Sequence, residues 1–220
     1  MIGKVGSGKT SLLKTLYGEL DVIDGEAEVL GYNMRSIKRK HIPQLRRKLG
    51  IVFQDFQLLT DRTVYNNLEF VLRATGWKNK QEIQDRIEEV LQLVGMSNKG
   101  YKLPNELSGG QRQRIAIARA MALDPDVIVC DEAVSALDVL VQDQVLRLLN
   151  DLQTEKGLSY LFITHDLAVV RQIADEVVVM QHGKLVEHAT TDEVFDHPQK
   201  QYTRDLLGAI PGGKLQLGLD

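Results

Sequence analysis

The chain has 220 residues, a hydrophobic content of 43% and a formal net charge of −3. This length can bury one sizeable core, and the slightly acidic balance gives no support for a nucleic-acid partner. A single cysteine, Cys130, excludes an intrachain disulfide and a multi-cysteine metal site. No apolar run approaches the roughly 18 residues that cross a bilayer, so we expect any membrane role to come through a partner.

A glycine-rich segment near the start fits the phosphate-loop pattern G-x-x-x-x-G-K-[ST]. Its members, with the serine that follows, are Gly3, Lys4, Val5, Gly6, Ser7, Gly8, Lys9, Thr10 and Ser11. Such glycines let backbone N–H groups surround a phosphate, the lysine reaches the terminal phosphates and the hydroxyl can hold Mg²⁺. The spacing of apolar residues predicts a helix over 11–17. Only Met1 and Ile2 precede the loop, so we expect the strand before it to be nearly absent and the chain to be cut at its front end.

The next hundred residues predict short strands and amphipathic helices. Strands are predicted at 26–30 and at 49–53, the second buried and ending at Gln54, and helices at 38–48, 63–75 and 81–94. In the last of these, apolar residues recur on one helix face, and Gly95 is a plausible stop. Residues 60–106 thus predict helices without strands, which indicates a helical insert in an α/β domain.

The second half alternates strands and helices. Strands are predicted at 126–131, 159–164 and 176–180, and helices at 111–123, 138–155 and 167–174. A turn at Gly183 leads into 184–187, and short helices follow from 191 to a loose segment at Pro211. Buried strands that alternate with helices predict an α/β fold with a mostly parallel sheet. We expect one domain over 1–220, with a nucleotide-binding core (1–59 and 107–190), a helical subdomain (60–106) and a C-terminal helical tail (191–220).

An acidic pair, Asp131 and Glu132, follows four apolar residues of a predicted strand. Ligands of open α/β sheets bind at the carboxyl ends of the strands, and Mg²⁺ prefers oxygen ligands. Thr10 and Asp131 are therefore candidate magnesium ligands, and Glu132 is a candidate base for a water molecule. The alternative is a pair of acids that caps a helix.

A second cluster of backbone N–H groups is predicted at Ser108, Gly109, Gly110 and Gln111, directly before a helix. One phosphate tail seldom needs two such sites, so we expect each cluster to belong to a different half of a shared site. A helix cap without further function is the alternative.

Taken in order, these motifs resemble the ATP-binding cassette of ABC transporters. The chain carries Walker A at 3–10, the Q-loop residue Gln54, the signature sequence at 107–111, Walker B with Asp131 and Glu132, the D-loop at 135–138 and the switch residue His165. The resemblance implies a P-loop, RecA-like fold with an inserted helical subdomain, in which the antiparallel strands that precede Walker A are missing here.

The same resemblance implies a mechanism and partners. Two cassettes, as a homodimer or as a heterodimer with another cassette, would sandwich two ATP molecules head to tail, each site combining one Walker A with the other chain's signature. Glu132 would polarise water, His165 would contact the γ-phosphate, Asp138 would belong to the ATP-binding set, and Thr10, Gln54 and Asp131 would hold Mg²⁺. The cassette would lie in the cytoplasm, on the inner face of the membrane, through an integral membrane subunit.

Within the family the halves resemble different members. Residues 1–107 are similar to the cell-division ATPase FtsE of the Bacteroidetes type, notably at 3–9, 45–59 and 66–72. Residues 108–220 are similar to dipeptide and oligopeptide importer ATPases, notably at 131–139, at 158–170 and in the tail at 197–198 and 201–207. A chimera is therefore predicted, with a natural intermediate lineage as the alternative.

The choice of membrane partner follows from where the halves lie. Because membrane subunits of this family dock near 54–106, an FtsX-like partner is slightly favoured over a peptide permease. Two further hypotheses stay open at this point: a soluble cassette that acts on DNA or ribosomes, and a shortened cassette with impaired turnover.

Overall fold

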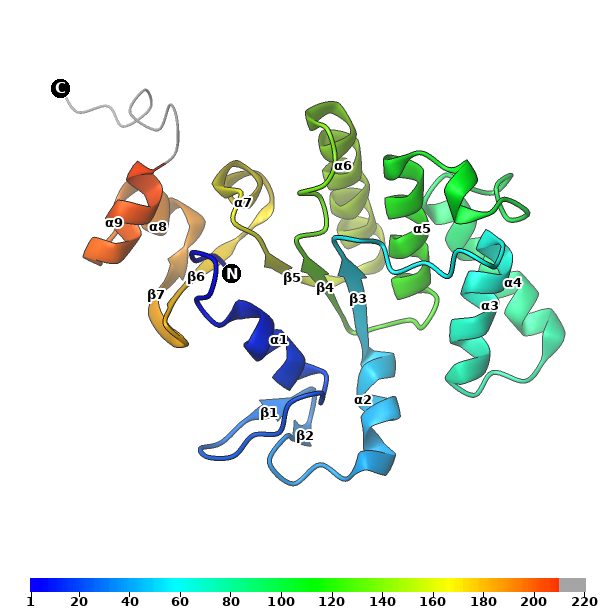
Figure 1. The fold of residues 1–220 in the computed structure, drawn as a ribbon, viewed down its shortest axis with the longest axis horizontal. Coiled ribbons are helices and arrows are strands. Elements are labelled where there is room, and N and C mark those ends of the chain that lie inside the picture. Colours follow the sequence, from blue (N-terminus) through cyan, green and yellow to red (C-terminus); the bar gives the residue numbers. More distant parts are fainter. Residues whose placement is uncertain (210–220) are drawn as a thin grey trace. The chain divides into compact units, whose positions relative to one another are not determined.

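The computed structural model describes residues 1–209 and divides the chain into two compact units. The first contains Met1–Thr15 and the chain from Phe162 onward, and the second contains Leu16–Leu161. Figure 1 shows the ribbon with its elements labelled. The loose segment predicted at Pro211 lies outside the described residues.

The second unit contains β3, β4 and the first three residues of β5, in a sheet with the strand order β3-β4-β5. These strands are β3 (Leu49–Phe53), β4 (Val127–Asp131) and β5 (Ser159–Ile163). β3 and β4 are parallel and in register, so that Phe53 lies opposite Asp131. A Cβ atom at Gly50 would lie 3.1 Å from the carbonyl oxygen of Ala120, and glycine therefore lets helix α5 approach β3 closely.

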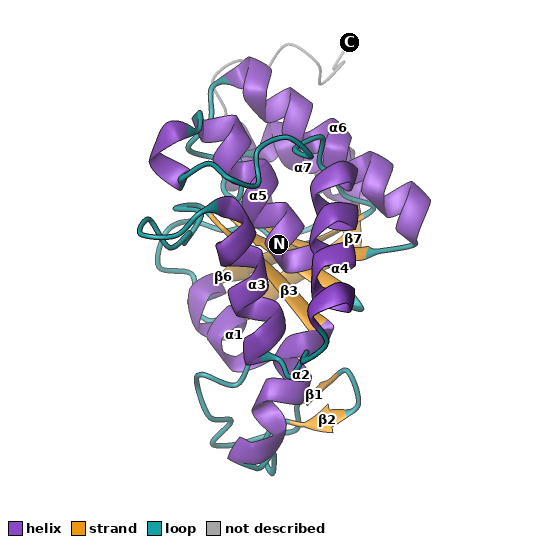
Figure 2. Cartoon of the chain, turned by 90° about the vertical axis from the view of Figure 1, so that its right-hand side faces the viewer, coloured by secondary structure: helices purple, strands orange, loops and turns teal. Residues whose placement is uncertain are grey.

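Five helices complete this unit: α2 (Ile42–Lys48), α3 (Val64–Ala74), α4 (Lys80–Leu93), α5 (Gly109–Met121) and α6 (Val139–Lys156), with the 3₁₀ turns η1 (Arg39–His41) and η2 (Pro104–Glu106). Thr63 and Asn79 cap α3 and α4 by accepting bonds from backbone N–H groups of the first turn. The turned view in Figure 2 shows α3 beside α4, and both pack against α5. The absence of strands from 60–106 was correctly predicted.

A short antiparallel hairpin joins β1 (Glu28–Val29) to β2 (Tyr32–Asn33). Its two turn residues, Leu30 and Gly31, have φ angles of +49° and +81°, the left-handed pair that matches the twist of a hairpin. The first strand was predicted and the second was missed, because two residues are too few for an alternating pattern to be visible.

Among its described residues, the first unit contains an antiparallel pair, β6 (Glu176–Gln181) and β7 (Lys184–Thr190), and four helices: α1 (Lys9–Leu16), α7 (Leu167–Ile173), α8 (Thr191–Asp196) and α9 (Gln201–Gly208). Its apolar core consists of Ile2, Leu167, Val170, Val177, Val179, Val194 and Phe195. Figure 1 shows α8 and α9 alongside β7.

Met1 and Ile2, which precede the phosphate loop, form strand-like backbone hydrogen bonds to neighbouring segments of the first unit. Met1 donates from its nitrogen to the Phe162 carbonyl (2.5 Å) and accepts from the Thr164 N–H (3.3 Å). Ile2 accepts from the Met180 N–H (2.9 Å), is fully buried and forms a parallel bridge to β6. The strand that was expected to be nearly absent thus consists of two residues, which are hydrogen-bonded on both sides.

The α/β class predicted from the alternation is confirmed, with a parallel pairing of β3 and β4 and two antiparallel hairpins. Within residues 1–209, no helix has both the length and the apolar character that crossing a membrane requires.

Candidate nucleotide-binding site

The phosphate loop adopts the backbone shape that its glycines permit. Gly6 and Gly8 have φ angles of +79° and +99°, in the left-handed region. The Ser7 N–H donates to the Lys4 carbonyl (3.1 Å), which closes the turn. A Cβ atom at Gly3 would collide with the carbonyl oxygen of Met180. Because the loop runs straight into α1, its free N–H groups and the helix N-terminus face the same space.

The ammonium group of Lys9 lies inside this loop. Its Nζ donates to the carbonyl oxygens of Gly3 (2.6 Å) and Lys4 (3.1 Å) and to the Ser7 hydroxyl (3.3 Å), and the residue is buried. A fixed positive charge therefore sits among the loop glycines, as phosphate binding requires. Thr10 and Ser11 follow on the exposed side of α1.

The turn between β6 and β7 supports the loop from outside. The Gly183 N–H donates to the Ser7 carbonyl (2.8 Å). A Cβ atom at Gly8 would lie only 3.1 Å from the Cα of Gly183. Glycine at Gly8 therefore lets the phosphate loop pack closely against the turn between β6 and β7. The sequence predicted a turn at Gly183 without indicating that it touches the phosphate loop, which lies some 180 positions earlier in the chain.

In the second unit, Gln54 and Asp131 leave neighbouring strands at the same edge. Phe53 lies opposite Asp131 in the parallel pairing, and Gln54 is the exposed residue that follows Phe53. The sheet thus places two residues predicted as metal ligands at the ends of adjacent strands. No group of three or more His, Cys, Asp or Glu residues in the described part of the chain could hold a metal ion. Mg²⁺ suits this sparse donor set, because it keeps waters and takes further ligands from substrate phosphates.

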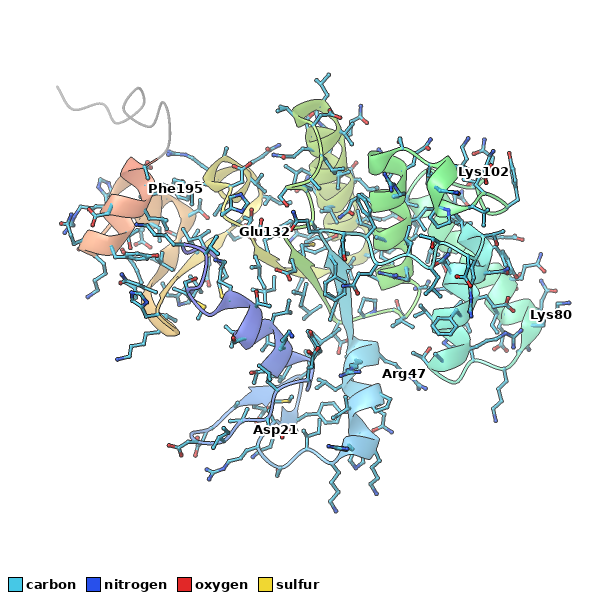
Figure 3. The ribbon with its side chains drawn as sticks, in the orientation of Figure 1. Asp21, Arg47, Lys80, Lys102, Glu132 and Phe195 are labelled. Carbon is cyan, nitrogen blue, oxygen red and sulfur yellow. The ribbon has the colours of Figure 1, made fainter. Side chains whose placement is uncertain are left out.

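Glu132 starts a fixed turn after β4. Its φ angle is +51°, an unusual value for a residue with a side chain. Its carbonyl accepts from the Ser135 N–H (3.1 Å) and hydroxyl (2.8 Å). The fully buried Gln113 of α5 donates to the next carbonyl, that of Ala133 (2.5 Å). Figure 3 labels Glu132, which directly follows β4 in the chain. The sequence identified Glu132 and missed Gln113. The bond from the Gln113 side chain to the Ala133 carbonyl joins residues 20 positions apart, and no local pattern predicts it.

The signature segment begins α5 with a reciprocal cap. The Ser108 hydroxyl accepts from the Gln111 N–H (3.3 Å), and the Gln111 side chain accepts from the Ser108 N–H (3.1 Å). Ser108 therefore caps the helix, which agrees with the alternative interpretation from the sequence. The role of this segment in a shared site stays a prediction. A Cβ atom at Gly110 would collide with Val141 of α6, so glycine lets the starts of α5 and α6 meet.

The D-loop lies directly before helix α6, and the switch residue His165 lies two positions before helix α7. Asp138 caps α6 by accepting from the Val141 N–H (3.0 Å). His165 is exposed and lies between Thr164, which pairs with Met1, and Asp166, which caps α7. Since Met1 and Thr164 are neighbours, His165 and the phosphate loop leave parallel strand segments at the same edge of the first unit. The structure thus groups the predicted residues into two sets, one in each unit. Their roles remain predictions.

Known proteins match both the sequence and the fold. The sequence profile of the ABC transporter family matches residues 1–135. The methionine import ATP-binding protein MetN of Helicobacter hepaticus is 41% identical over 211 residues, which is 96% of this chain and 60% of that protein. MetN 1 of Acinetobacter baylyi is 40% identical over 207 residues, 94% of this chain and 58% of that protein. The chain thus spans about 60% of the length of these relatives.

Two solved structures share the fold. CbiO1 of Clostridium perfringens, described as part of the ABC transporter complex CbiONQ, has a TM-score of 0.81 at 30% identity and covers 97% of this chain and 84% of its own. The ATP-binding cassette MJ0796, solved as a dimer in a post-hydrolysis state with ADP and Pi, has a TM-score of 0.75 at 30% identity and covers 86% and 83%. The fold is that of the P-loop ATP-binding cassettes, and the chain belongs to the ABC transporter family.

Proposed function

We propose that this chain is the subunit of a membrane importer that binds ATP with Mg²⁺ and hydrolyses the ATP. One observation carries the proposal: Gln54 and Asp131 end adjacent parallel strands, and Glu132 follows in a turn held by Ser135 and Gln113. This arrangement supplies metal ligands and a carboxylate at one sheet edge, in a chain that also has a complete phosphate loop.

The phosphate loop fits the phosphates of ATP. Gly6 and Gly8 turn the backbone so that N–H groups face inward, and Lys9 adds a buried positive charge. The N-terminus of α1 adds a favourable dipole. Thr10, Gln54 and Asp131 provide the hydroxyl, amide and carboxylate oxygens that would hold Mg²⁺. When bound, the metal would neutralise charge on the phosphate oxygens.

The chemical step is assigned to Glu132 and His165. Glu132 would orient a water molecule and accept its proton, a role that requires a carboxylate held in a defined direction. The two bonds from Ser135 and the bond from Gln113 to Ala133 supply that fixed backbone. His165, which follows β5 and lies in the first unit, would contact the γ-phosphate.

A dimer completes the proposal. The signature segment presents the helix N-terminus of α5 next to the D-loop, and one phosphate tail uses one such N-terminus from Walker A already. The signature is therefore assigned to ATP bound by a second cassette, in a homodimer or in a heterodimer. The solved structure of the related MJ0796, itself a dimer with ADP and Pi, supports this assignment.

An importer role has more support than the cell-division role favoured by the sequence. The matched relatives carry the name of methionine importers and align over 94–96% of this chain, across the signature where the two halves were predicted to join. This continuity supports a single lineage over a chimera. Methionine import is the first candidate and peptide import the second, with an integral membrane subunit that would hold the cassette at the inner face of the membrane. An FtsX-like partner rests on location alone, because the docking region at 54–106 belongs to the half that resembles FtsE.

The enzymatic half of the proposal is tested by phosphate release from Mg²⁺–ATP. Glu132→Gln should abolish steady-state hydrolysis, a loss of at least about a hundredfold for a removed general base, and should retain ATP binding. Glu88→Gln, an exposed carboxylate of α4, is the matched control and should hydrolyse ATP like the parent chain. Retained turnover in Glu132→Gln would remove Glu132 from this role.

The partner is tested by co-expression with the membrane subunit of a methionine importer, a peptide permease or FtsX. The importer proposal expects a complex with one of the first two and stimulated ATP hydrolysis in that complex. A complex formed with FtsX alone would restore the cell-division role.

A further inference from the structure

We propose that Tyr202, in the C-terminal helix α9, is a positioning residue for the phosphate loop. Its hydroxyl oxygen accepts a hydrogen bond of 3.2 Å from the backbone N–H of Lys4, 198 positions earlier in the chain. Tyr202 lies in the tail segment 201–207, which resembles importer ATPases, and outside the nucleotide-binding motifs of the chain. The inference rests on the proposed ATP binding, because the loop it positions is the one assigned to the phosphates.

Lys4 connects Tyr202 to Lys9, because its backbone groups bond to both side chains. While its N–H is held by Tyr202, its carbonyl accepts from the Lys9 ammonium (3.1 Å) and from the Ser7 N–H (3.1 Å). The two peptide groups that flank the Lys4 Cα are therefore fixed from opposite sides. A shift of this residue would move an acceptor of the Lys9 ammonium and open the turn that Ser7 closes.

Helix α9 is held in place independently of the loop. The carboxylate of Glu187 on β7 accepts the N–H groups of Gln199 (2.8 Å) and Lys200 (3.2 Å), directly before the helix. Leu206 and Leu207 pack against the apolar core of the first unit, which also contains Ile2. Figure 3 labels Phe195 of α8, which is a member of this apolar core. The Tyr202 hydroxyl is thus presented by a docked helix, and a residue that orients a binding group is effective when its own support is rigid.

The expected consequence is a change in ATP affinity rather than in the chemical step. Tyr202 touches the loop that carries the phosphate-binding lysine, whereas Glu132 is fixed by Ser135 and Gln113. Removing one exposed hydrogen bond should weaken ATP binding by about two- to tenfold. The KM for ATP should rise by the same factor, and kcat at saturating ATP should stay within about twofold of the parent value.

Tyr202→Phe in the full chain tests the proposal, because it removes only the hydroxyl. Tyr160→Phe is the matched control: its hydroxyl donates a bond of 2.9 Å to the Leu149 carbonyl in the second unit. Amide hydrogen exchange without nucleotide should become faster at residues 3–9 in Tyr202→Phe and stay unchanged there in Tyr160→Phe. ATP affinity should fall in Tyr202→Phe alone.

Three results would overturn the inference. The first is unchanged loop exchange in Tyr202→Phe, and the second is an equal effect of Tyr160→Phe on the loop. The third is faster exchange throughout β6 and β7, since that would mean general loosening of the unit. Failure of the proposed function is a different result: the parent chain would not bind Mg²⁺–ATP at all, while the exchange measurement would still report whether Tyr202 positions the loop.

Discussion

Arg119 of α5 donates a hydrogen bond of 2.9 Å to the backbone carbonyl of Phe56, in the loop that follows Gln54. Its other terminal nitrogen donates to the next carbonyl, that of Gln57. Both loop residues have positive φ angles, +61° and +46°, so the guanidinium group fixes a backbone shape that costs free energy to hold. Burial lowers the pKa of Arg119, and Asp55 opposes this effect. The guanidinium nevertheless stays charged at neutral pH. The helix that begins with the signature thus holds the Q-loop.

Arg119→Lys should loosen this loop, because a single ammonium cannot reproduce the planar fork that serves two carbonyls. We expect the free energy of unfolding to fall by about 1–3 kcal/mol and amide exchange at 55–59 to become faster. Arg147→Lys is the control, since Arg147 is exposed and pairs with Asp143 on the same helix (2.9 Å). Arg147→Lys should change the free energy of unfolding by no more than about 0.5 kcal/mol. Identical behaviour of the two variants would contradict the role of Arg119.

Gln113→Met should lower kcat at saturating ATP while leaving ATP affinity nearly unchanged. The substitution keeps the buried volume and removes the donor to the Ala133 carbonyl, so the turn that carries Glu132 loses one of its supports. The unmade bond should also cost about 1–3 kcal/mol of stability. Gln84→Met, at an exposed position of α4, should change neither quantity measurably. If kcat is preserved in Gln113→Met, the turn does not depend on Gln113.

Glu187→Gln should destabilise the docking of α9 in a pH-dependent way. Burial raises the pKa of Glu187, but the Thr203 side chain and the N–H groups of Gln199 and Lys200 lower it by more, so the pKa lies below its ordinary value of 4.5. A carboxyl group whose pKa is depressed by folding stabilises the protein above its ordinary pKa, and this contribution disappears as the pH falls through the lowered value. We therefore expect a loss of about 1–3 kcal/mol at pH 7 that shrinks towards pH 3.

Urea unfolding of the parent chain and of Glu187→Gln at both pH values measures this loss. Glu155→Gln is the control, because that exposed side chain forms a surface ion pair with Lys156 (3.3 Å). A difference between parent and Glu187→Gln that is the same at pH 7 and pH 3 would rule out the carboxylate charge as its cause.

Ser108→Arg should prevent ATP-dependent dimerisation without preventing ATP binding. In a Glu132→Gln background, which is expected to trap bound ATP, the parent signature should give dimers in size-exclusion chromatography with light scattering. The arginine would fill the exposed start of α5 and remove a helix cap, which should cost about 0.5–2 kcal/mol of stability. Thr63→Arg removes a comparable cap from α3 and should leave the dimer intact. A monomer at saturating ATP in the Glu132→Gln background alone would contradict the head-to-tail sandwich.

The sequence by itself determined the α/β class, nearly every helix and strand, and the residues of the phosphate loop, the signature and the acidic pair. These are local properties: apolar residues at helical or strand spacing, glycines where the backbone must turn, and acids after a buried strand. The β1–β2 hairpin extends over too few residues to leave such a pattern, and β2 was missed for that reason.

Only the tertiary structure decided which residues support the site. Three supporting side chains bond to backbone groups far away in the chain, at separations of 63, 20 and 198 positions for Arg119, Gln113 and Tyr202. Every residue has a backbone carbonyl and every residue except proline has an N–H, so no side-chain pattern identifies the partner. Two residues, Met1 and Ile2, serve as a strand because β5 and β6 provide hydrogen-bonding partners on both sides. Their pairing depends on segments from the far end of the chain, and the physical reason is that backbone hydrogen bonds are specified by folding and not by sequence neighbours.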